Sequence, residues 1–329
     1  MKLDLSIIII NYNTRDLLYQ CLKSILKNKN NFNLEILVID NASRDNSVEM
    51  VRKNFPKIKL IINKENLGFP KAVNLGLKRI YGRNILLLNP DTKILRKAIP
   101  KMVKFLDQNK KVGAVGPKIY GARGQILCSA RPLINLFDCI FSSSILQPWK
   151  LPSSIRLPLR FLFHEEKYLK TCFFAKHPFK INGLLSGSCF MIKKEVIDKI
   201  GPKDPKLYFF GEESDWCKKI LKSGYKIYFL PEAKIIHYIG QSTKRRDKKS
   251  LFEYSKLIYR DRLYFQNKVY YCRKNFPKFP LWILKFSIIL ELGLKILFQI
   301  FNIRNPEERK TKIKVYWQIK KEILFPKDD

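Results

Sequence analysis

The chain has 329 residues, of which 46% are hydrophobic; this is enough for one large or two moderate domains with a substantial core, and it excludes a disordered chain. Lys and Arg outnumber Asp and Glu by 64 to 28, which gives a formal net charge of +36. The excess is densest in residues 241–329, with 22 Lys and Arg against 9 Asp and Glu. A charge of this size predicts an anionic partner surface.

The cysteines and the N-terminus bear on the compartment. The seven cysteines include no C-x-x-C pair and are odd in number, which argues against a disulfide framework or a zinc knuckle. The N-terminus enters an expected strand after residues 1–4, without the basic leader, apolar stretch and small-residue cleavage site of a signal peptide. These features predict a protein of the reducing cytosol.

The first half of the chain alternates short apolar runs with segments of helical period, the pattern of a parallel sheet covered by helices. Asn13 is expected to cap the first helix, Ser43 to open the second in the same way, and Pro70 to lie in the first turn of the third. The expected strands are residues 6–10, 34–39, 59–62 and 85–88.

The second half is less regular. Residues 121–177 have no sustained period and are expected to be loop-rich and to shape specificity. Ordered structure is expected to resume at 181–192 and 195–200 and to continue with a helix over 212–223 that stops at Gly224. Two short strands, 225–230 and 233–237, are expected to follow.

Residues 282–301 are strongly apolar and about as long as a membrane span. Lys285, Glu291 and Lys295 interrupt them at near-helical spacing, so a helix lying in a membrane interface fits better than a spanning one. The flanking basic and aromatic residues suit an anionic bilayer surface. The alternative is a core helix packed on the rest of the protein.

Polar residues follow the expected strands where open α/β sheets place their chemistry. Asp40 and Asn41 come after strand 34–39, where a carboxylate and an amide can hydrogen-bond a planar heterocycle while helix N-termini face phosphates. The same residue types are common helix caps, so that interpretation stays open.

Asp91 follows strand 85–88, and Pro90 stiffens the turn. A carboxylate beside a diphosphate is what Mg²⁺ or Mn²⁺ requires, although an Asp in an ordinary turn remains the alternative. His237 ends an apolar run and can supply an imidazole to the same cation, or serve a structural role.

Glu212, Glu213 and Asp215 lie in the first turn of the helix expected over 212–223, where the helix dipole also favours acids. At about 100° per residue the apolar stripe of this helix is centred on the direction of Glu213, whereas Asp215 lies nearly opposite. Glu213 is therefore expected to point inward, where a half-buried carboxylate can take a proton from an attacking hydroxyl.

With these residues assembled, the chain resembles family 2 glycosyltransferases of the GT-A fold, particularly a branch similar to rhamnosyltransferases. The motifs that carry the resemblance span most of residues 5–243: SIIIINYNT (6–14), LVIDNASRDNSV (37–48), NKENLGFPKAVNLGL (63–77), LLLNPDT (86–92), VGAVGPKI (112–119), GSCFMIKKE (187–195) and FFGEESDWCKKILKSGYKIYFLPEAKIIHYIGQST (209–243).

The resemblance implies an α/β fold with a mixed, mainly parallel sheet in a catalytic domain over 1–243. Within it, about 1–120 would bind the nucleotide-sugar and about 181–243 would carry the acceptor and catalytic side. Residues 244–329 would form a basic, amphipathic helical extension that associates with the membrane.

The resemblance also assigns roles to single residues. It implies that the nucleotide-sugar pocket is lined by Asn11, Asn13, Asp40, Asn41, Asn66 and Gly68. It places Asp91 at the last position of an Asp-x-Asp metal motif, with Asn89 in place of the first Asp, and His237 at a position near the metal. Glu213 falls where the family's base is usually Asp, so Glu212 and Asp215 remain reserve candidates.

The predicted activity is inverting transfer of a sugar, rhamnose as the first choice, from a dTDP- or UDP-sugar to a hydroxyl of a saccharide or lipid-linked saccharide. Mg²⁺ or Mn²⁺ is the predicted cofactor, and the inner face of the cell membrane the predicted location. The alternatives are a catalytically idle binding module, a nucleotidyltransferase and a nucleic-acid-binding protein. The absence of any recognisable nucleic-acid-binding module in the sequence argues against the last of these.

Overall fold

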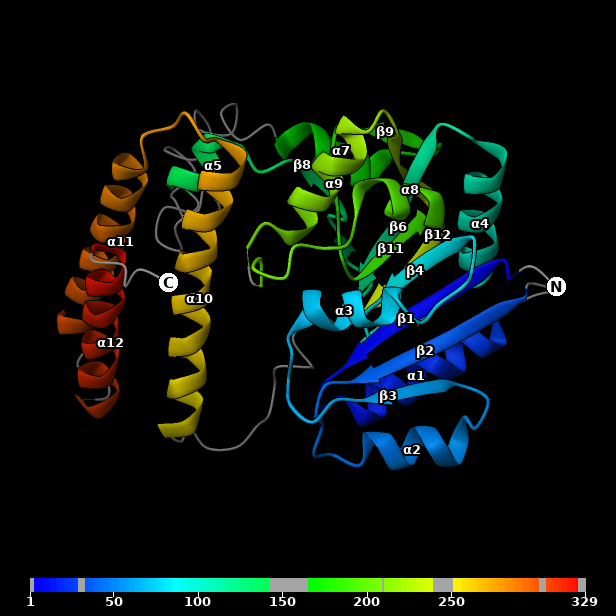
Figure 1. The fold of residues 1–329 in the computed structure, drawn as a ribbon, viewed down its shortest axis with the longest axis horizontal. Coiled ribbons are helices and arrows are strands. Elements are labelled where there is room, and N and C mark those ends of the chain that lie inside the picture. Colours follow the sequence, from blue (N-terminus) through cyan, green and yellow to red (C-terminus); the bar gives the residue numbers. More distant parts are fainter. Residues whose placement is uncertain are drawn as a thin grey trace. The chain divides into compact units, whose positions relative to one another are not determined.

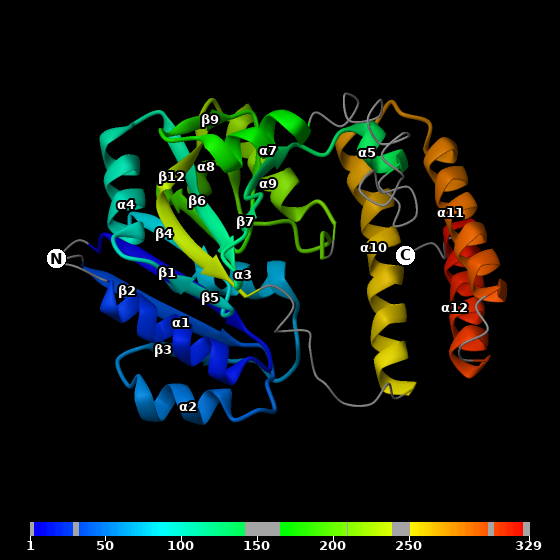
Figure 2. The ribbon, with the colours of Figure 1, turned by 180° about the vertical axis from the view of Figure 1, so that it is seen from behind.

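The computed structural model describes residues 3–28, 33–141, 165–208, 210–238, 251–301 and 306–324 (Figure 1 and, from behind, Figure 2). The chain divides into two compact units, and each is described by itself. Unit 1 contains Met1–Leu133, Glu165–Pro205 and Glu213–Arg245, and unit 2 contains Ile134–His164, Lys206–Glu212 and Arg246–Asp329.

Unit 1 is built on a mixed sheet that has ten strands within the described residues. Along the sheet the order is β3-β2-β1-β4-β11-β6-β12-β5, with β7 paired to β6 and β9 to β12. The first four are parallel, β6 and β12 are parallel, and β11 runs antiparallel to β4 and β6. The strands are β1 (Leu5–Asn11), β2 (Leu34–Asp40), β3 (Lys59–Ile62), β4 (Asn84–Leu88), β5 (Thr92–Ile94), β6 (Val112–Gly121), β7 (Ile126–Leu127), β9 (Phe179–Ile181), β11 (Cys189–Lys193) and β12 (Lys226–His237).

Helices cover both faces of this sheet because its central strands are buried on both sides. Alternate residues along β1 enter two different hydrophobic clusters: Ile7 and Ile9 lie in one, and Ile8 in the other. The first cluster is completed by α1 (Arg15–Lys27), α2 (Ser47–Asn54) and α4 (Ala98–Gln108). The second is completed by α3 (Phe69–Leu77), α7 (Glu165–Phe174), α8 (Lys194–Ile200) and α9 (Glu212–Lys222). The predicted mixed, mainly parallel fold is confirmed.

Two helix starts differ from the sequence prediction. The residue before α1 is Thr14 rather than Asn13, and α2 begins at Ser47, four residues beyond Ser43. Neither helix has a side-chain capping hydrogen bond. Asn13 and Ser43 bond to each other's loop instead, with the Asn13 amide donating to Ser43 Oγ at 2.9 Å. Tertiary contacts therefore use the side chains that local pattern assigns to caps.

The two strands expected over 225–230 and 233–237 are one strand, β12. Its register against β6 shifts between Leu230 and Lys234, and Pro231 in this interval has no N–H for the ladder. The described part of the segment expected to be loop-rich contains β7, β8 (Ala130–Pro132), α5 (Leu136–Phe141) and α7. β8 pairs with β10 (Gly183–Leu185) in a separate small sheet. Residues 142–164 lie outside the described residues.

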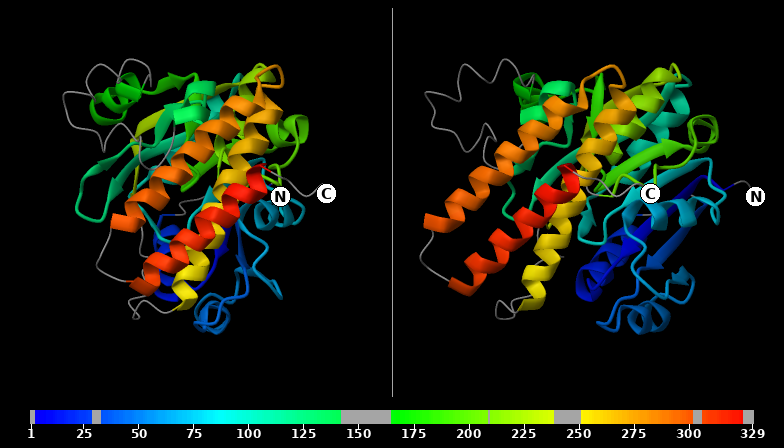
Figure 3. Two further views of the ribbon diagram at one scale, coloured as in Figure 1. Left: turned by 90° about the vertical axis from the view of Figure 1, so that its left-hand side faces the viewer. Right: turned by 60° about the vertical axis from the view of Figure 1, so that its left-hand side comes forward.

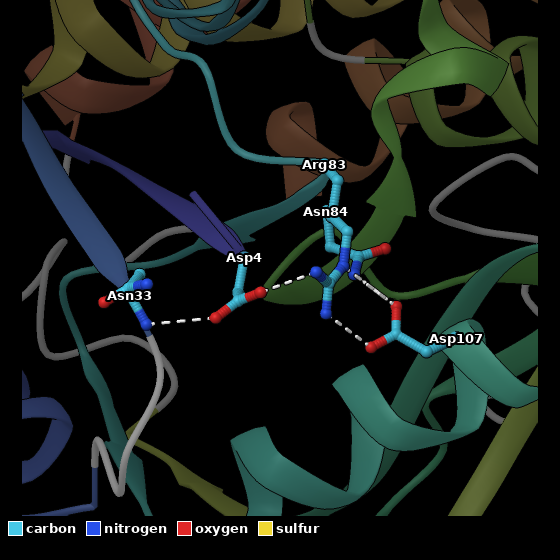
Figure 4. A network of polar contacts seen from close by, with 5 residues as sticks. All are labelled: Asp4, Asn33, Arg83, Asn84 and Asp107. Carbon is cyan, nitrogen blue, oxygen red and sulfur yellow. Dashed lines mark hydrogen bonds and ion pairs between the residues drawn. The ribbon is translucent and has the colours of Figure 1, made fainter. Parts of the chain in front are cut away.

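The amino ends of the parallel strands are joined by an ionic network (Figure 4). Arg83, just before β4, pairs with Asp4 at 2.6 Å and with Asp107 at the end of α4 at 2.8 Å. Asp4 also accepts from the Asn33 amide, and Asp107 from Asn84. This network fixes one end of the sheet and leaves the carboxyl ends of the strands to build a site.

Unit 2 consists mainly of the helices α10 (Leu251–Asn275), α11 (Leu281–Phe301) and α12 (Pro306–Leu324), which lie side by side in Figure 3. Their shared core includes Phe265, Leu284, Ile288 and Ile319, and Cys139 of α5 joins it. None of the helices in the described parts of the chain has both the length and the apolar character needed to cross a membrane.

Glu35 on β2 is a buried carboxylate near the amino ends of the strands. It accepts hydrogen bonds from Ser6 Oγ at 2.5 Å, from the Tyr81 amide at 2.7 Å and from Lys59 Nζ at 2.7 Å. Burial by itself raises the pKa of Glu35, but these hydrogen bonds outweigh burial and lower the pKa below its usual value.

A lowered pKa in the folded state means that ionised Glu35 stabilises the fold above its unfolded pKa of about 4.3, and that this contribution is lost as the pH falls through the lower folded pKa. We expect Glu35→Gln to reduce the free energy of unfolding at pH 7 by about 1–2 kcal/mol, and this difference to shrink in acid. Urea denaturation over a pH series measures it, with exposed Glu49→Gln on α2 as the control. A difference that does not change with pH would contradict the prediction.

Candidate functional site

The carboxyl ends of β1, β2 and β4 lie side by side in parallel register. Asn11 is paired with Asp40, and Ile9 with Leu88, the residue before Asn89. The Asn41 amide donates to the Asn11 carbonyl at 2.8 Å, which extends the pairing beyond the strands. The structure therefore brings together the three strand ends from which the sequence predicted a polar site.

A buried hydrogen-bond network joins the ends of β1 and β2. Asn11 Nδ2 donates to Asp40 Oδ2 at 2.8 Å and to Ser43 Oγ at 3.1 Å, while Asn11 Oδ1 accepts from Thr14 Oγ1 at 2.6 Å. The other Asp40 oxygen accepts from the Ser43 amide at 2.8 Å. Asp40 is 1% exposed, so these bonds compensate the cost of burying its charge. Asn13 adjoins the network with a left-handed φ of 54°, and its Oδ1 accepts from the Arg44 amide.

A second network joins the end of β2 to the start of α3. Asn41 Nδ2 donates to Asn66 Oδ1 at 3.2 Å, and Asn66 Oδ1 also accepts from the Gly68 amide at 2.9 Å. Gly68 has a φ of 77°, a conformation that glycine adopts without strain. Asn63 Nδ2 donates to Asn41 Oδ1 at 2.8 Å, a contact that sequence reasoning missed although Asn63 opens the motif at 63–77. This network fixes the turn before the N-terminus of α3.

Asp91, in the turn after β4, and His237, the last residue of β12, lie together. His237 Nε2 is 3.1 Å from Asp91 Oδ1, and both side chains are largely buried. β12 places His237 opposite Thr92 of β5, and the Tyr238 amide donates to the Asp91 carbonyl at 2.9 Å. The two residues proposed from sequence as cation ligands are thus held side by side by strand pairing.

The donor set fits a divalent cation that completes its coordination with phosphate oxygens. Mg²⁺ is usually held by one or two carboxylates together with substrate phosphates, and imidazole nitrogen is also a ligand of divalent cations, so Asp91 and His237 would offer one oxygen and one nitrogen ligand. Burial raises the pKa of nearby Cys21 to about 12, so its thiol stays protonated and is a poor ligand. Within the described ranges, no group of three or more His, Cys, Asp or Glu residues forms a site made of protein alone.

Asn89 connects this pair to the turn formed by residues 186–188. Its amide donates to the Ser188 carbonyl at 3.0 Å, and its own carbonyl accepts from Thr92 Oγ1 at 2.7 Å. The same turn meets Glu213 from α9, since a Cβ added to Gly187 would lie 2.7 Å from Glu213 Oε1. Gly187 thus allows the Glu213 carboxylate to approach the backbone of the turn, and sequence reasoning gave Gly187 no role in the site.

The three acids of α9 differ in their surroundings. Glu213 and Glu212 are half-buried, whereas Asp215 is only 3% exposed, with its carboxylate 3.6 Å from Lys219 Nζ. The expectation that Asp215 faces away from the packed side is wrong, because α9 is buried around most of its circumference and not along one stripe. Of the three, Glu213 is the carboxylate that lies against the turn next to Asn89.

Lys203 is a buried cation that the sequence analysis did not single out. It is 3% exposed, and its Nζ lies 5.0 Å from the ring centre of Trp216 and 5.8 Å from that of Phe69. Asn74 holds its backbone by accepting from the Lys203 amide and donating to the Lys203 carbonyl. A positive charge therefore lies between α9 and the start of α3, where no short-range pattern signals it.

Unit 1 has the GT-A fold: a mixed sheet whose parallel strands carry polar groups at their carboxyl ends, with an Asp–His pair close by. Residues 6–201 match the sequence model of glycosyl transferase family 2, and the chain belongs to this family.

Two relatives of this chain are rhamnosyltransferases by name. The chain is similar to an N-acetylglucosaminyl-diphospho-decaprenol L-rhamnosyltransferase of Mycobacterium tuberculosis, with 22% identity over 237 residues that cover 69% of this chain and 73% of the relative. It is similar to the dTDP-rhamnosyl transferase RfbF of Shigella flexneri, with 22% identity over 246 residues covering 74% and 72%. The solved structure of GalNAc-T7 with UDP, GalNAc and Mn2+ has the same fold, with a TM-score of 0.53 at 18% identity, covering 88% of this chain and 55% of that one.

Proposed function

We propose that the protein transfers a sugar, with inversion at the anomeric carbon, from a dTDP- or UDP-sugar to a hydroxyl of a lipid-linked or cell-surface saccharide. Rhamnose is the sugar we put first, because both relatives described above are rhamnosyltransferases. The observation that carries the proposal is the Asp91–His237 pair at 3.1 Å, with Glu213 against the neighbouring 186–188 turn. This arrangement supports separate groups for the leaving diphosphate and for the attacking hydroxyl.

The donor nucleotide would bind along the ends of β1 and β2. Asp40 and Asn41 are the groups we assign to the base, and Asn11 and Asn13 hold the loops around them. Asn66 and Gly68 shape the start of α3, and the N-terminus of a helix favours phosphate oxygens. The side chain of Asn89 makes no hydrogen bond within the described part of the chain, so its side-chain amide is available to the nucleotide-sugar.

Asp91 and His237 are the residues we assign to a Mg²⁺ or Mn²⁺ ion. When bound there, such an ion supplies charge neutralisation for the diphosphate as it leaves. Asp91 contributes the negative oxygen, and strand pairing positions His237 so that little reorganisation is needed.

Glu213 is the group we assign as general base. It takes the proton of the acceptor hydroxyl as that oxygen forms a bond to the anomeric carbon from the face opposite the leaving group. The bond from the anomeric carbon to the diphosphate oxygen breaks, and the electron pair leaves with the nucleoside diphosphate. The half-buried position of Glu213 keeps the carboxylate within reach of an acceptor while limiting water around it.

We also propose that the enzyme works at the inner face of the cell membrane as a peripheral protein. Two features support this: the high positive charge of the chain, and the M. tuberculosis relative, whose name specifies a decaprenol-linked substrate. A lipid-linked acceptor would be presented there.

Asp91→Ala is expected to weaken Mn²⁺-dependent binding of dTDP or UDP by at least about a hundredfold, because the variant loses the only carboxylate that we assign to the cation. His237→Ala should weaken it less. Isothermal titration calorimetry with and without Mn²⁺ measures both, with Asp198→Ala and His177→Ala as controls at exposed positions. Metal-independent binding that Asp91→Ala leaves unchanged would contradict the assignment, and release of pyrophosphate in place of a nucleoside diphosphate would identify a nucleotidyltransferase.

Glu213→Gln is expected to lower kcat by roughly 10²–10⁴-fold while leaving the donor Kd within about twofold, because the amide keeps the shape of the side chain but cannot accept the proton. Glu212→Gln and Asp215→Asn are the comparison variants. Transfer from a dTDP-sugar to a saccharide acceptor measures the effect. A larger loss in either comparison variant than in Glu213→Gln would move the base to that residue.

Gly187→Ala tests the position of the same carboxylate without removing it. The added methyl would lie 2.7 Å from Glu213 Oε1, at the flexible end of a side chain, so the carboxylate should shift at little cost to folding. We expect kcat to fall about tenfold with the donor Kd and Tm nearly unchanged. Gly293→Ala, which meets no atom within 4 Å, is the control. An unchanged kcat would mean that this approach is not required for transfer.

A further inference from the structure

One face of α11 exposes a continuous row of large apolar side chains. Trp282 is 70% exposed, Phe286 63% and Leu290 53%, and the row continues at helical spacings of three or four residues. Its members, here called the α11 stripe, are Trp282, Phe286, Leu290, Leu294, Leu297 and Ile300. Among the α11 residues whose exposure is described, every exposed one belongs to this stripe.

Two of the three charged residues of α11, Glu291 and Lys295, lie on the opposite, buried face, and the third, Lys285, is half-buried. Glu291 is 3% exposed, and its carboxylate is 3.1 Å from Lys295 Nζ. Lys295 in turn lies 4.9 Å from the ring centre of Phe265 on α10 and 5.6 Å from that of Tyr316 on α12. Lys268 of α10 is fully buried nearby, and the charge of Glu291 acts on it.

This distribution is the reverse of that of a helix at the surface of a water-soluble bundle. Such a helix turns its apolar side to the core and its charges to water. In α11 both sides are apolar, and ions are buried between the helices at a desolvation cost. An exposed apolar row of this length is the mark of an interaction site.

The neighbouring helix indicates the kind of partner. α12 lies beside α11 (Figure 3) and exposes Trp317 together with Lys310, Lys314 and Lys321. A helix at a membrane interface typically combines three kinds of side chain. Apolar side chains enter the acyl region, tryptophans lie at the headgroup level, and lysines bind headgroup phosphates.

We propose that α11 docks on the surface of an anionic lipid bilayer, with the α11 stripe inserted below the headgroups and the exposed lysines of α12 bound to lipid phosphates. A second copy of the chain fits this face less well, because it would bring another net charge of +36 to the contact, whereas an anionic bilayer neutralises that charge. The inference extends the proposed function, since it names the surface that would bring the enzyme to a lipid-linked acceptor.

The test is sedimentation of the full chain with vesicles, without donor or acceptor. The vesicles are phosphatidylcholine with or without phosphatidylglycerol. We expect Phe286→Asp combined with Leu290→Asp to reduce binding to the anionic vesicles at least about tenfold, since two apolar side chains that would be inserted into the bilayer are lost. Phe174→Asp, at an exposed aromatic position on α7, is the matched control and should bind as the wild type does.

Replacement of Lys310, Lys314 and Lys321 by Gln should weaken binding to anionic vesicles by about fivefold per lysine and leave binding to neutral vesicles unchanged. Undiminished vesicle binding by the Asp double variant would overturn the proposal. So would a wild type that elutes as a dimer while the double variant elutes as a monomer, which would identify a second copy as the partner. Calorimetric binding of dTDP or UDP should be the same in all these variants, so a failure of the donor site and a failure of this surface are distinguishable.

Discussion

The site depends on the hydrogen bond between Asn11 and Asp40 at the carboxyl ends of two parallel strands. A carboxylate that is 1% exposed is tolerated only if its oxygens accept hydrogen bonds. Here one oxygen of Asp40 accepts from the side-chain amide of Asn11, and the other accepts from the backbone amide of Ser43. The bond therefore ties the loop after β2 to the end of β1. Since Asn41 continues the strand pairing and reaches Asn66, the order extends from this bond to the start of α3.

β1, β2 and β4 were predictable because parallel strands buried on both faces appear in sequence as unbroken apolar runs. β3 is an edge strand with Lys59 and Ile62 exposed, and only its short apolar run predicted it. Residues 6–10, 34–39, 59–62 and 85–88 all lie within β1 to β4. The helix starts were less predictable because Asn and Ser can satisfy either a helix end or another loop. At Asn13 and Ser43 the tertiary contact prevails, and the helices begin later without side-chain caps.

The residues of the candidate site that directly follow or end a strand could be predicted from the sequence. Those that depend on contacts between distant segments were harder to predict. The sequence indicated Asp91 and His237 as ligands of one cation, and the pairing of β12 with β5 explains why they meet. The burial of Asp215 was predicted wrongly, because a helical wheel assumes one packed face and α9 has more than one. Gly187 opens one of the motifs but was given no role, and Lys203 gave no signal, since their partners are set by the fold and not by neighbours in sequence.

The turn at residues 186–188 connects two parts of the candidate site. Ser188 accepts a hydrogen bond from the backbone amide of Asn89, two residues before Asp91, and Gly187 leaves room for the Glu213 carboxylate. One short stretch of backbone therefore contacts both the segment that leads to Asp91 and the carboxylate that we assign as general base. The inversion that we propose would require these groups to act on opposite sides of one carbon, so their positions must be held by the backbone around them. A side chain at position 187 would displace the Glu213 carboxylate from this place, which is why glycine suits this position of the turn.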